Sequence, residues 1–388
     1  MQNRWIILLV LFFARTAMAF QFQSVAALSP LMVDSLAVSL VDIGLLIGLY
    51  LGPGIIVATL GGTVASWIGD RRTVFISLLL MVAGSVLVAQ ASTLNWLLAG
   101  RILSGIGGVV VNVVMTKMVI DWFAGRNIAT AMAIFISSWP LGIALALLVL
   151  PGLAGFGGLW LAWTGVTIVT AVALVLFGAL YRTPPGAETR AAGLKAAALP
   201  WVPLIMAALV WALYNTGLAM IFGFGPIMLA ERGLSAASAS SATSLFMFAI
   251  GVAAPLGGWM ADRTGYRDTF IIISLVAAII LFPAMLYLSV SYAWLAFGVA
   301  GFIVGLAPGP IVSLPSLILL PQARAFGMGI YYSLYYSLMM AVPPAAGMIA
   351  DYLSSVDVAF LLSAAMMIGA VVALFFYRRT AIKPTGEA

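Results

Sequence analysis

The chain is an almost unbroken succession of long apolar segments, and this feature limits its possible folds more than any other. Apolar residues make up 64% of the sequence and charged residues 7%, and the mean hydropathy is +1.19. No soluble globular domain has this composition. Runs of about 18 or more apolar residues recur along the whole length, which is typical of membrane-spanning helices. We therefore expect an all-α integral membrane protein.

Charges, Pro and Gly divide the sequence into twelve apolar segments. They are residues 5–28, 43–66, 73–90, 95–118, 127–150, 159–181, 201–229, 236–261, 269–290, 292–320, 326–350 and 358–377. With the N-terminus inside, Arg232 is the one basic residue of the outer loops, so the positive-inside rule predicts that both termini are cytoplasmic. We expect a multi-pass protein of a bacterial-type inner (plasma) membrane.

A signal peptide is the alternative interpretation of the first segment. Arg4, the apolar run 5–13 and the small residues around Ala17 and Ala19 imitate its charged, apolar and cleavage regions. The apolar run continues past Ala19 to Leu28, which favours a permanent span.

The sequence contains no Cys and no His. This absence excludes disulfides, Cys or His metal sites, and thiol or imidazole catalysis. We predict neither an enzyme nor a cofactor. The net charge of +6 follows the membrane topology, so it does not indicate a nucleic-acid partner.

Arg15 lies about halfway along the first apolar segment, which contains no acidic residue. A charge at that depth costs about 2.5 to 3.5 kcal/mol or more, so it is by default a functional-site candidate. Its snorkelling to the membrane surface is the alternative, and the mid-helix position disfavours it. We expect Arg15 to face a water-filled cavity that receives an anion.

The two halves of the chain resemble each other. Gly62–Arg71 (GTVASWIGDR) and Gly258–Arg267 (GWMADRTGYR) follow the second and eighth segments at an offset of 196 residues. A duplication explains this pattern. It predicts an N-terminal six-helix half at 1–181, a cytoplasmic linker at 182–200 and a C-terminal six-helix half at 201–388.

These motifs resemble those of the major facilitator superfamily over essentially the whole chain. Gly258–Arg267 is similar to the family's cytoplasmic loop signature, Arg101–Gly107 (RILSGIG) to its motif in the fourth span, and Pro140–Gly142 is a weaker echo of its Pro-Gly motif. A less specific resemblance, through Arg15 and the residues after it, is to the cyanate and nitroimidazole permease branch. The resemblance implies twelve helices, a cavity lined by spans 1, 4, 7 and 10, and a monomer.

The resemblance also implies a conformational role for charges in the cytoplasmic loops. The residues concerned are Asp70, Arg71, Asp262, Arg263 and Arg267. The first loop departs from the family pattern, because Ser66 occupies the usual Asp position and Asp70 is displaced by four residues.

Helical geometry groups the candidate binding residues of the N-terminal half. Arg101 and Asn112 fall, with two glycines between them, within about 60° of each other around the fourth span. Arg15 and Gln23 share a face of the first span about 80° wide. Both guanidinium groups could then reach one anion. Arg101 could instead be a folding residue that binds backbone carbonyls inside its bundle.

The C-terminal half offers neutral donors and aromatic walls in place of these charges. Its candidate binding residues are Trp211, Tyr214, Asn215 and Ser313, with Trp211 at the repeat position of Arg15. Tyr331 and Tyr335 belong to a tyrosine-rich face that could gate or line the path. Packing between helices remains the alternative for each of these aromatic residues.

Every acidic residue falls in a predicted loop, span boundary or tail, so no proton carrier lies within the membrane. We therefore predict a secondary transporter for a small anion, organic or inorganic, working by exchange or uniport. The alternative is an exporter of amphipathic drugs or metabolites in which the arginines are structural. A non-transporting receptor is a further alternative, but the short termini disfavour it.

Overall fold

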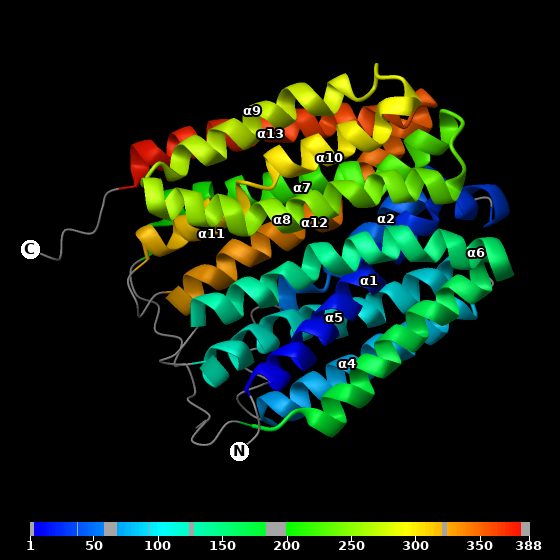
Figure 1. The fold of residues 1–388 in the computed structure, drawn as a ribbon, viewed down its shortest axis with the longest axis horizontal. Coiled ribbons are helices and arrows are strands. Elements are labelled where there is room, and N and C mark those ends of the chain that lie inside the picture. Colours follow the sequence, from blue (N-terminus) through cyan, green and yellow to red (C-terminus); the bar gives the residue numbers. More distant parts are fainter. Residues whose placement is uncertain are drawn as a thin grey trace, which may run out of the picture.

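The computed structural model describes residues 4–36, 38–57, 68–91, 93–123, 128–183, 199–319 and 324–381. Within these ranges all regular elements are helices. The start of α1 and the end of α13 lie at the same end of an elongated bundle (Figure 1), which we name the terminal end. The opposite end is named the far end.

Most of the helices are long enough to cross a bilayer. The α-helices of the described residues are α1 (Arg4–Leu36), α2 (Leu40–Leu51), α4 (Asp70–Ala89), α5 (Leu94–Phe123), α6 (Ile128–Leu180), α7 (Trp201–Glu231), α8 (Ala236–Thr264), α9 (Arg267–Ala284), α10 (Ala293–Val304), α11 (Pro308–Ser313), α12 (Arg324–Leu353) and α13 (Asp357–Thr380).

The twelve predicted spans correspond to these elements. Ten stretches are long and apolar enough to cross a membrane, and α6 counts among them once although it is two helices joined at a kink. The kink lies at Gly157 and Gly158, where φ reaches +67°. α12 supplies the remaining span and packs against α2 and α7, its tyrosines lowering its hydropathy. The predicted all-α membrane fold is confirmed.

Two elements differ from their predicted bounds because of proline. α1 continues past residue 28 through Pro30, and the Ala26 carbonyl, which finds no N–H at residue 30, accepts a hydrogen bond of 2.8 Å from the Ser29 hydroxyl. The predicted segment 292–320 is broken between α10 and α11, just before Pro308 and Pro310. Broken helices of this kind are common in transporters.

The helices form two groups along the chain. α1 packs on α6 and α4 on α5 in the first group, whereas α7 packs on α13 and α8 on α10 in the second. The groups meet where α2 contacts α12 and where α6 contacts α8 (Figure 1). Residues 184–198, most of the predicted linker, lie outside the described residues.

The groups are joined tightly at the far end. The Asp351 carboxylate of α12 accepts hydrogen bonds from the first two N–H groups of α2, those of Leu40 at 3.0 Å and Val41 at 2.9 Å. These N–H groups have no partner inside their own helix, and the positive end of the helix favours a carboxylate there. Close packing continues inward, since a Cβ at Gly44 or Gly48 would collide with the backbone of α12.

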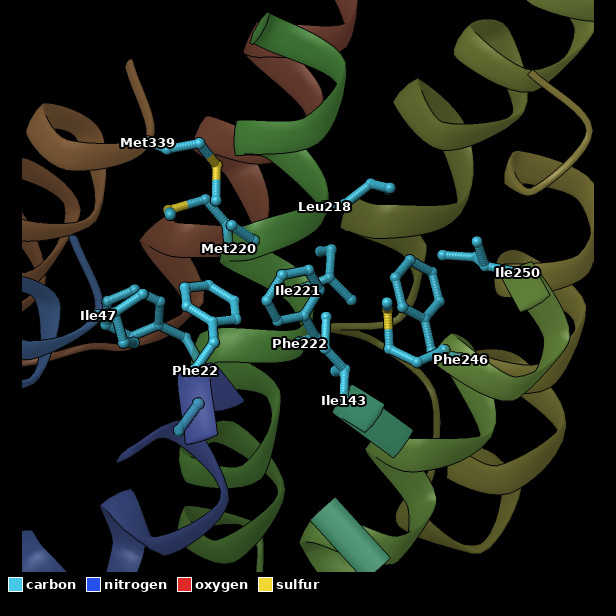
Figure 2. Close-up of a cluster of buried hydrophobic side chains, with 14 of the residues drawn as sticks. Phe22, Ile47, Ile143, Leu218, Met220, Ile221, Phe222, Phe246, Ile250 and Met339 are labelled. Carbon is cyan, nitrogen blue, oxygen red and sulfur yellow. The ribbon is translucent and has the colours of Figure 1, made fainter. Parts of the chain in front are cut away.

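A buried apolar cluster fills the space between the groups near mid-bundle (Figure 2). Phe22 of α1 and Phe222 of α7 approach each other there, with ring centroids 6.3 Å apart. Phe22 also stacks on Trp139 of α6 at 5.3 Å. The cluster thus contains aromatic contacts both within the first group and between the two groups.

Candidate functional site

Arg15 lies half-buried in α1 and is held by α5 and α6. Its Nε donates to Asn112 Oδ1 at 2.9 Å, and its Nη1 donates to the carbonyls of Phe135 at 2.9 Å and Ile136 at 3.1 Å. Nη1 also lies 3.4 Å from Ser138 Oγ. The guanidinium carbon sits 4.8 Å from the centroid of the Phe135 ring. The structure therefore brings Arg15 and Asn112, two of the predicted binding residues, into direct contact.

Pro140 explains why a helix can offer a carbonyl to Arg15. The Ile136 carbonyl would ordinarily accept the N–H of residue 140, but proline has none. The freed oxygen accepts the Arg15 hydrogen bond instead. This role of Ile136 was not predicted from the sequence, although a proline inside a helix indicates that the carbonyl four residues before it is free.

The charge of Arg15 has no fixed counter-charge within the described part of the chain. Its hydrogen-bond partners are two carbonyls, an amide and a hydroxyl, and no ion pair involves it. Nη2 donates no hydrogen bond to any described residue. A guanidinium held in this way retains donors for an incoming anion.

Tyrosines of α12 extend the site across to the second group of helices. The Asn112 amide Nδ2 donates to the Tyr336 hydroxyl at 3.5 Å. The Tyr336 ring lies 4.9 Å from that of Tyr335 and 6.5 Å from that of Tyr332, centroid to centroid. All three belong to the tyrosine-rich face of this span, and it is Tyr336 that meets Asn112.

Trp211 and Tyr331 complete an aromatic wall beside these tyrosines. The Trp211 ring lies 6.4 Å from Tyr331, 6.2 Å from Tyr335 and 6.3 Å from Tyr214, centroid to centroid. The Trp211 Nε1 and the Tyr331 hydroxyl are buried and have no hydrogen-bond partner among the described residues. The structure thus brings Trp211, Tyr331 and Tyr335 together in one aromatic cluster.

Arg101 occupies a different environment. It is 1% exposed, and each of its three guanidinium nitrogens donates at 2.8 Å to a backbone carbonyl: Nε to Leu46, Nη1 to Gln21 and Nη2 to Phe22. The Tyr50 ring covers it at 4.6 Å. This geometry matches the folding role that the sequence left open.

The expected shared anion between Arg15 and Arg101 needs correction. Arg15 bonds Asn112, which is eleven residues beyond Arg101 and so about 16 Å further along α5. The glycines between them do not open toward a cavity, since a Cβ at Gly105 would collide with the Tyr50 carbonyl. Helical periodicity places residues on one stripe but does not show that different neighbours cover its two ends.

The other predicted binding residues use their polar atoms inside the protein. Gln23 Nε2 donates to the Phe222 carbonyl at 2.9 Å, across the two groups of helices, and Pro226 frees that carbonyl as Pro140 frees Ile136. Three further residues bond within their own group: Tyr214 to the Val304 carbonyl at 2.9 Å, Asn215 to the Trp211 carbonyl at 2.8 Å and Ser313 to the Pro310 carbonyl at 2.7 Å.

The predicted gating charges lie at the terminal end. Asp70 pairs with Lys117 at 2.7 Å, and Arg71 Nη2 donates to the Gly178 carbonyl at 3.1 Å. Arg263 is exposed, 5.3 Å from the centroid of the Trp259 ring, and Arg267 begins α9. The Asp262 side chain and Ser66 lie outside the described residues. The gating roles stay predictions.

Sequence comparison places this architecture in a known family. The family model of the Major Facilitator Superfamily matches residues 9–228 and 207–388. The chain belongs to the Major Facilitator Superfamily. Its members are membrane transporters, so this protein is a secondary transporter and not an enzyme.

Relatives within the Major Facilitator Superfamily differ in what their names say they carry. The lysosomal dipeptide transporter of Mus musculus is 23% identical over 409 residues, which cover 97% of this chain and 87% of that protein. The hexuronate transporter of Bacillus subtilis is 26% identical over 279 residues, or 68% and 65% of the two chains.

A solved structure shares the fold. It is a bacterial homolog of the human lysosomal transporter Spinster in an inward-facing and occupied conformation, with a TM-score of 0.77. The two chains are 17% identical, and the match covers 98% of this chain and 99% of the other.

Proposed function

We propose that this transporter carries a small anion, organic or inorganic, across a bacterial-type inner membrane, and that Arg15 is the charge that binds it. One observation carries the proposal: Arg15 lies half-buried at mid-helix with neutral partners alone among the described residues and with Nη2 unbonded. A charge held in this way is costly unless a mobile anion offsets it.

The chemistry of the remaining wall supports an anion as well. Beyond Asn112, which accepts from Arg15, lies the Tyr336 hydroxyl, and the neighbouring Tyr335 and Tyr332 add further phenol groups that can donate hydrogen bonds to negative oxygen atoms. One relative is named for hexuronate, which is itself an organic anion.

The conformation that we assign is inward-facing, with the terminal end in the cytoplasm. Asp351 on the α2 N-terminus and Gln23 on Phe222 join the two groups of helices toward the far end, and the buried apolar cluster of Figure 2 fills the space around Phe222. The solved Spinster homolog of similar fold is described as inward-facing. Arg15 would then meet its anion from the cytoplasmic side.

Alternating access would rock residues 1–181 against 201–388 around this site, with 182–200 as the linker and the protein acting as a monomer. Asp70, Arg71, Asp262, Arg263 and Arg267 at the terminal end, with Tyr331 and Tyr335 beside the site, are the proposed conformational residues.

Exchange or uniport follows from the placement of the carboxylates. The described acidic residues lie at helix ends and in loops, as Asp42 at the start of α2 and Asp351 near the end of α12 illustrate. No carboxylate in the described mid-membrane region could carry a proton beside Arg15. The bound anion would therefore itself offset the charge during the crossing.

The test is counterflow in proteoliposomes loaded with a panel of inorganic and organic anions. Wild type is compared with Arg15→Gln, and Arg379→Gln is the matched control, because Arg379 lies exposed at the terminal end of α13. We expect at least a hundredfold loss for Arg15→Gln and none for Arg379→Gln. Monodispersity in detergent checks the folding of both variants.

Two results would overturn the proposal. One is Arg15→Gln transporting anions at the wild-type rate. The other is uptake of neutral amphipathic compounds that the substitution leaves untouched, which would support the exporter with structural arginines. A proton stoichiometrically coupled to uptake by the purified protein would refute exchange and uniport but leave the anion site standing.

A further inference from the structure

The aromatic wall contains two hydrogen-bonding groups that nothing in the described structure satisfies. The Tyr331 side chain is fully buried at 0% exposure, and its hydroxyl has no partner. The Trp211 Nε1 is also buried and unbonded, and its ring stacks on that of Tyr331 with an interplanar angle of 21°. Buried polar groups in native proteins are nearly always paired, so two neighbouring exceptions need a cause.

The wall connects these two groups to Arg15 without a break. The Tyr335 ring lies 6.2 Å from that of Trp211 and 4.9 Å from that of Tyr336, centroid to centroid. The Tyr336 hydroxyl accepts a hydrogen bond from Asn112 Nδ2 at 3.5 Å, and Asn112 Oδ1 accepts one from Arg15 Nε at 2.9 Å. A molecule with its charge on Arg15 would therefore lie along tyrosine rings and end near Trp211 and Tyr331.

The hydrogen-bonding properties of the Trp211 N–H and the Tyr331 hydroxyl define which chemical group the substrate must place beside them. An indole N–H only donates, so it requires an acceptor, and a phenol hydroxyl can donate to the same acceptor. An ammonium group would satisfy the Tyr331 oxygen but leave the Trp211 N–H unpaired. A carbonyl, carboxylate or ether oxygen satisfies both.

We propose that the substrate is a two-ended organic anion: a carboxylate held by Arg15, a flat or apolar middle against the tyrosines, and a hydrogen-bond acceptor held by Trp211 Nε1 and the Tyr331 hydroxyl. This inference rests on the proposed anion transport and narrows its substrate class. Simple inorganic anions would occupy Arg15 alone.

Specificity should follow from the cost of leaving these donors unpaired. A site with hydrogen-bonding groups discriminates strongly against an analogue that lacks the matching group, because the buried donors then stay unsatisfied. The repeat gives the arrangement a simple origin, since Trp211 occupies in the second half the position that Arg15 occupies in the first.

The experiment measures competition for counterflow by pairs of linear carboxylates of four to eight carbons. One member of each pair ends in a methyl ketone, and in the other a methyl branch replaces the ketone oxygen. We expect the wild type to prefer the ketone at one or two chain lengths by at least tenfold. Tyr331→Phe removes the hydroxyl and Trp211→Phe removes the indole N–H, and both retain an aromatic ring. Each should reduce that preference to threefold or less.

Tyr214→Phe is the matched control. Its ring also packs against Trp211, but its hydroxyl is already bonded to the Val304 carbonyl, so the ketone preference should persist. The Arg15→Gln measurement separates the two proposals. Anion transport that depends on Arg15 but shows no ketone preference at any length, or a preference unchanged in both Trp211→Phe and Tyr331→Phe, overturns the two-ended substrate and leaves anion transport intact.

Discussion

The surroundings of Arg15 and of Arg101 are the two most instructive regions of this molecule. Both arginines lie in the first group of helices, and each lies in an apolar segment where a charge is energetically costly. Arg101 is buried, and each of its guanidinium nitrogens donates a hydrogen bond to a backbone carbonyl. Arg15 is half-buried, one of its nitrogens is unbonded, and its neighbours extend onto the second group.

The difference shows that depth in the membrane identifies an unusual charge but not its use. What distinguishes a structural arginine from a ligand-binding one is whether all of its N–H donors are hydrogen-bonded within the protein. A saturated guanidinium ties α1, α2 and α5 together, whereas an unsaturated one is available to a ligand. The predictions below test this separation.

The largest effect on stability is expected at Arg101. Arg101→Met removes the donors of three carbonyls and should lower the free energy of unfolding by about 3 kcal/mol. The thermal midpoint of the purified protein should fall by roughly 5 to 10 °C. Arg15→Gln removes a charge without a counter-charge, so its midpoint should be unchanged or higher. Equal destabilisation by both substitutions would contradict the separation.

Arg15→Lys tests whether transport requires the planar set of guanidinium donors as well as the positive charge. A single ammonium nitrogen cannot serve Asn112, the α6 carbonyls and an anion with the geometry of a planar guanidinium. We expect kcat/KM for anion counterflow to fall about tenfold, with Arg379→Lys unchanged. Wild-type kinetics in Arg15→Lys would show that charge alone suffices.

Pro140→Ala tests the freed carbonyl that helps to position Arg15. The new N–H would compete for the Ile136 oxygen and loosen the guanidinium. KM should rise about threefold with little change in the thermal midpoint. A collapse of stability instead would show that Pro140 shapes α6 rather than the site.

The smallest effect is expected at the far end, where Asp351→Asn removes the charge from the α2 N-terminus. Such contacts contribute about 0.3 to 1 kcal/mol, so the far-end-open population should rise about two- to fivefold. The cysteine-free sequence allows spin labels at Phe156→Cys and Ala237→Cys to report the opening as a distance. The pair Phe156→Cys and Trp96→Cys, within one group, should not change.

Much of the fold could be predicted from the sequence because apolar length and charge placement are properties of the chain itself. Those properties located both ends of α7 and α13, and the start of α1, to within a few residues. The break before Pro308 and the continuation of α1 through Pro30 were less accessible. In a packed bundle, a proline ends a helix only where no neighbour or side chain satisfies the freed carbonyl.

The site could be predicted in part. Arg15 contacts Asn112, and Trp211 lies beside Tyr331 and Tyr335, because depth and helix face are readable in a sequence. The role of Gln23 could not be predicted, because Gln23 bonds a carbonyl that Pro226 frees in another helix. Such a contact joins residues about two hundred positions apart, and no local pattern records it.

The unused donor of Arg15 has a practical consequence for any laboratory that handles this protein. Because Nη2 has no hydrogen-bond partner among the described residues, we expect chloride from the buffer to compete with a weakly bound substrate. Affinities measured in chloride and in gluconate will then differ. The salt in the buffer therefore has to be specified with every affinity measured for this transporter.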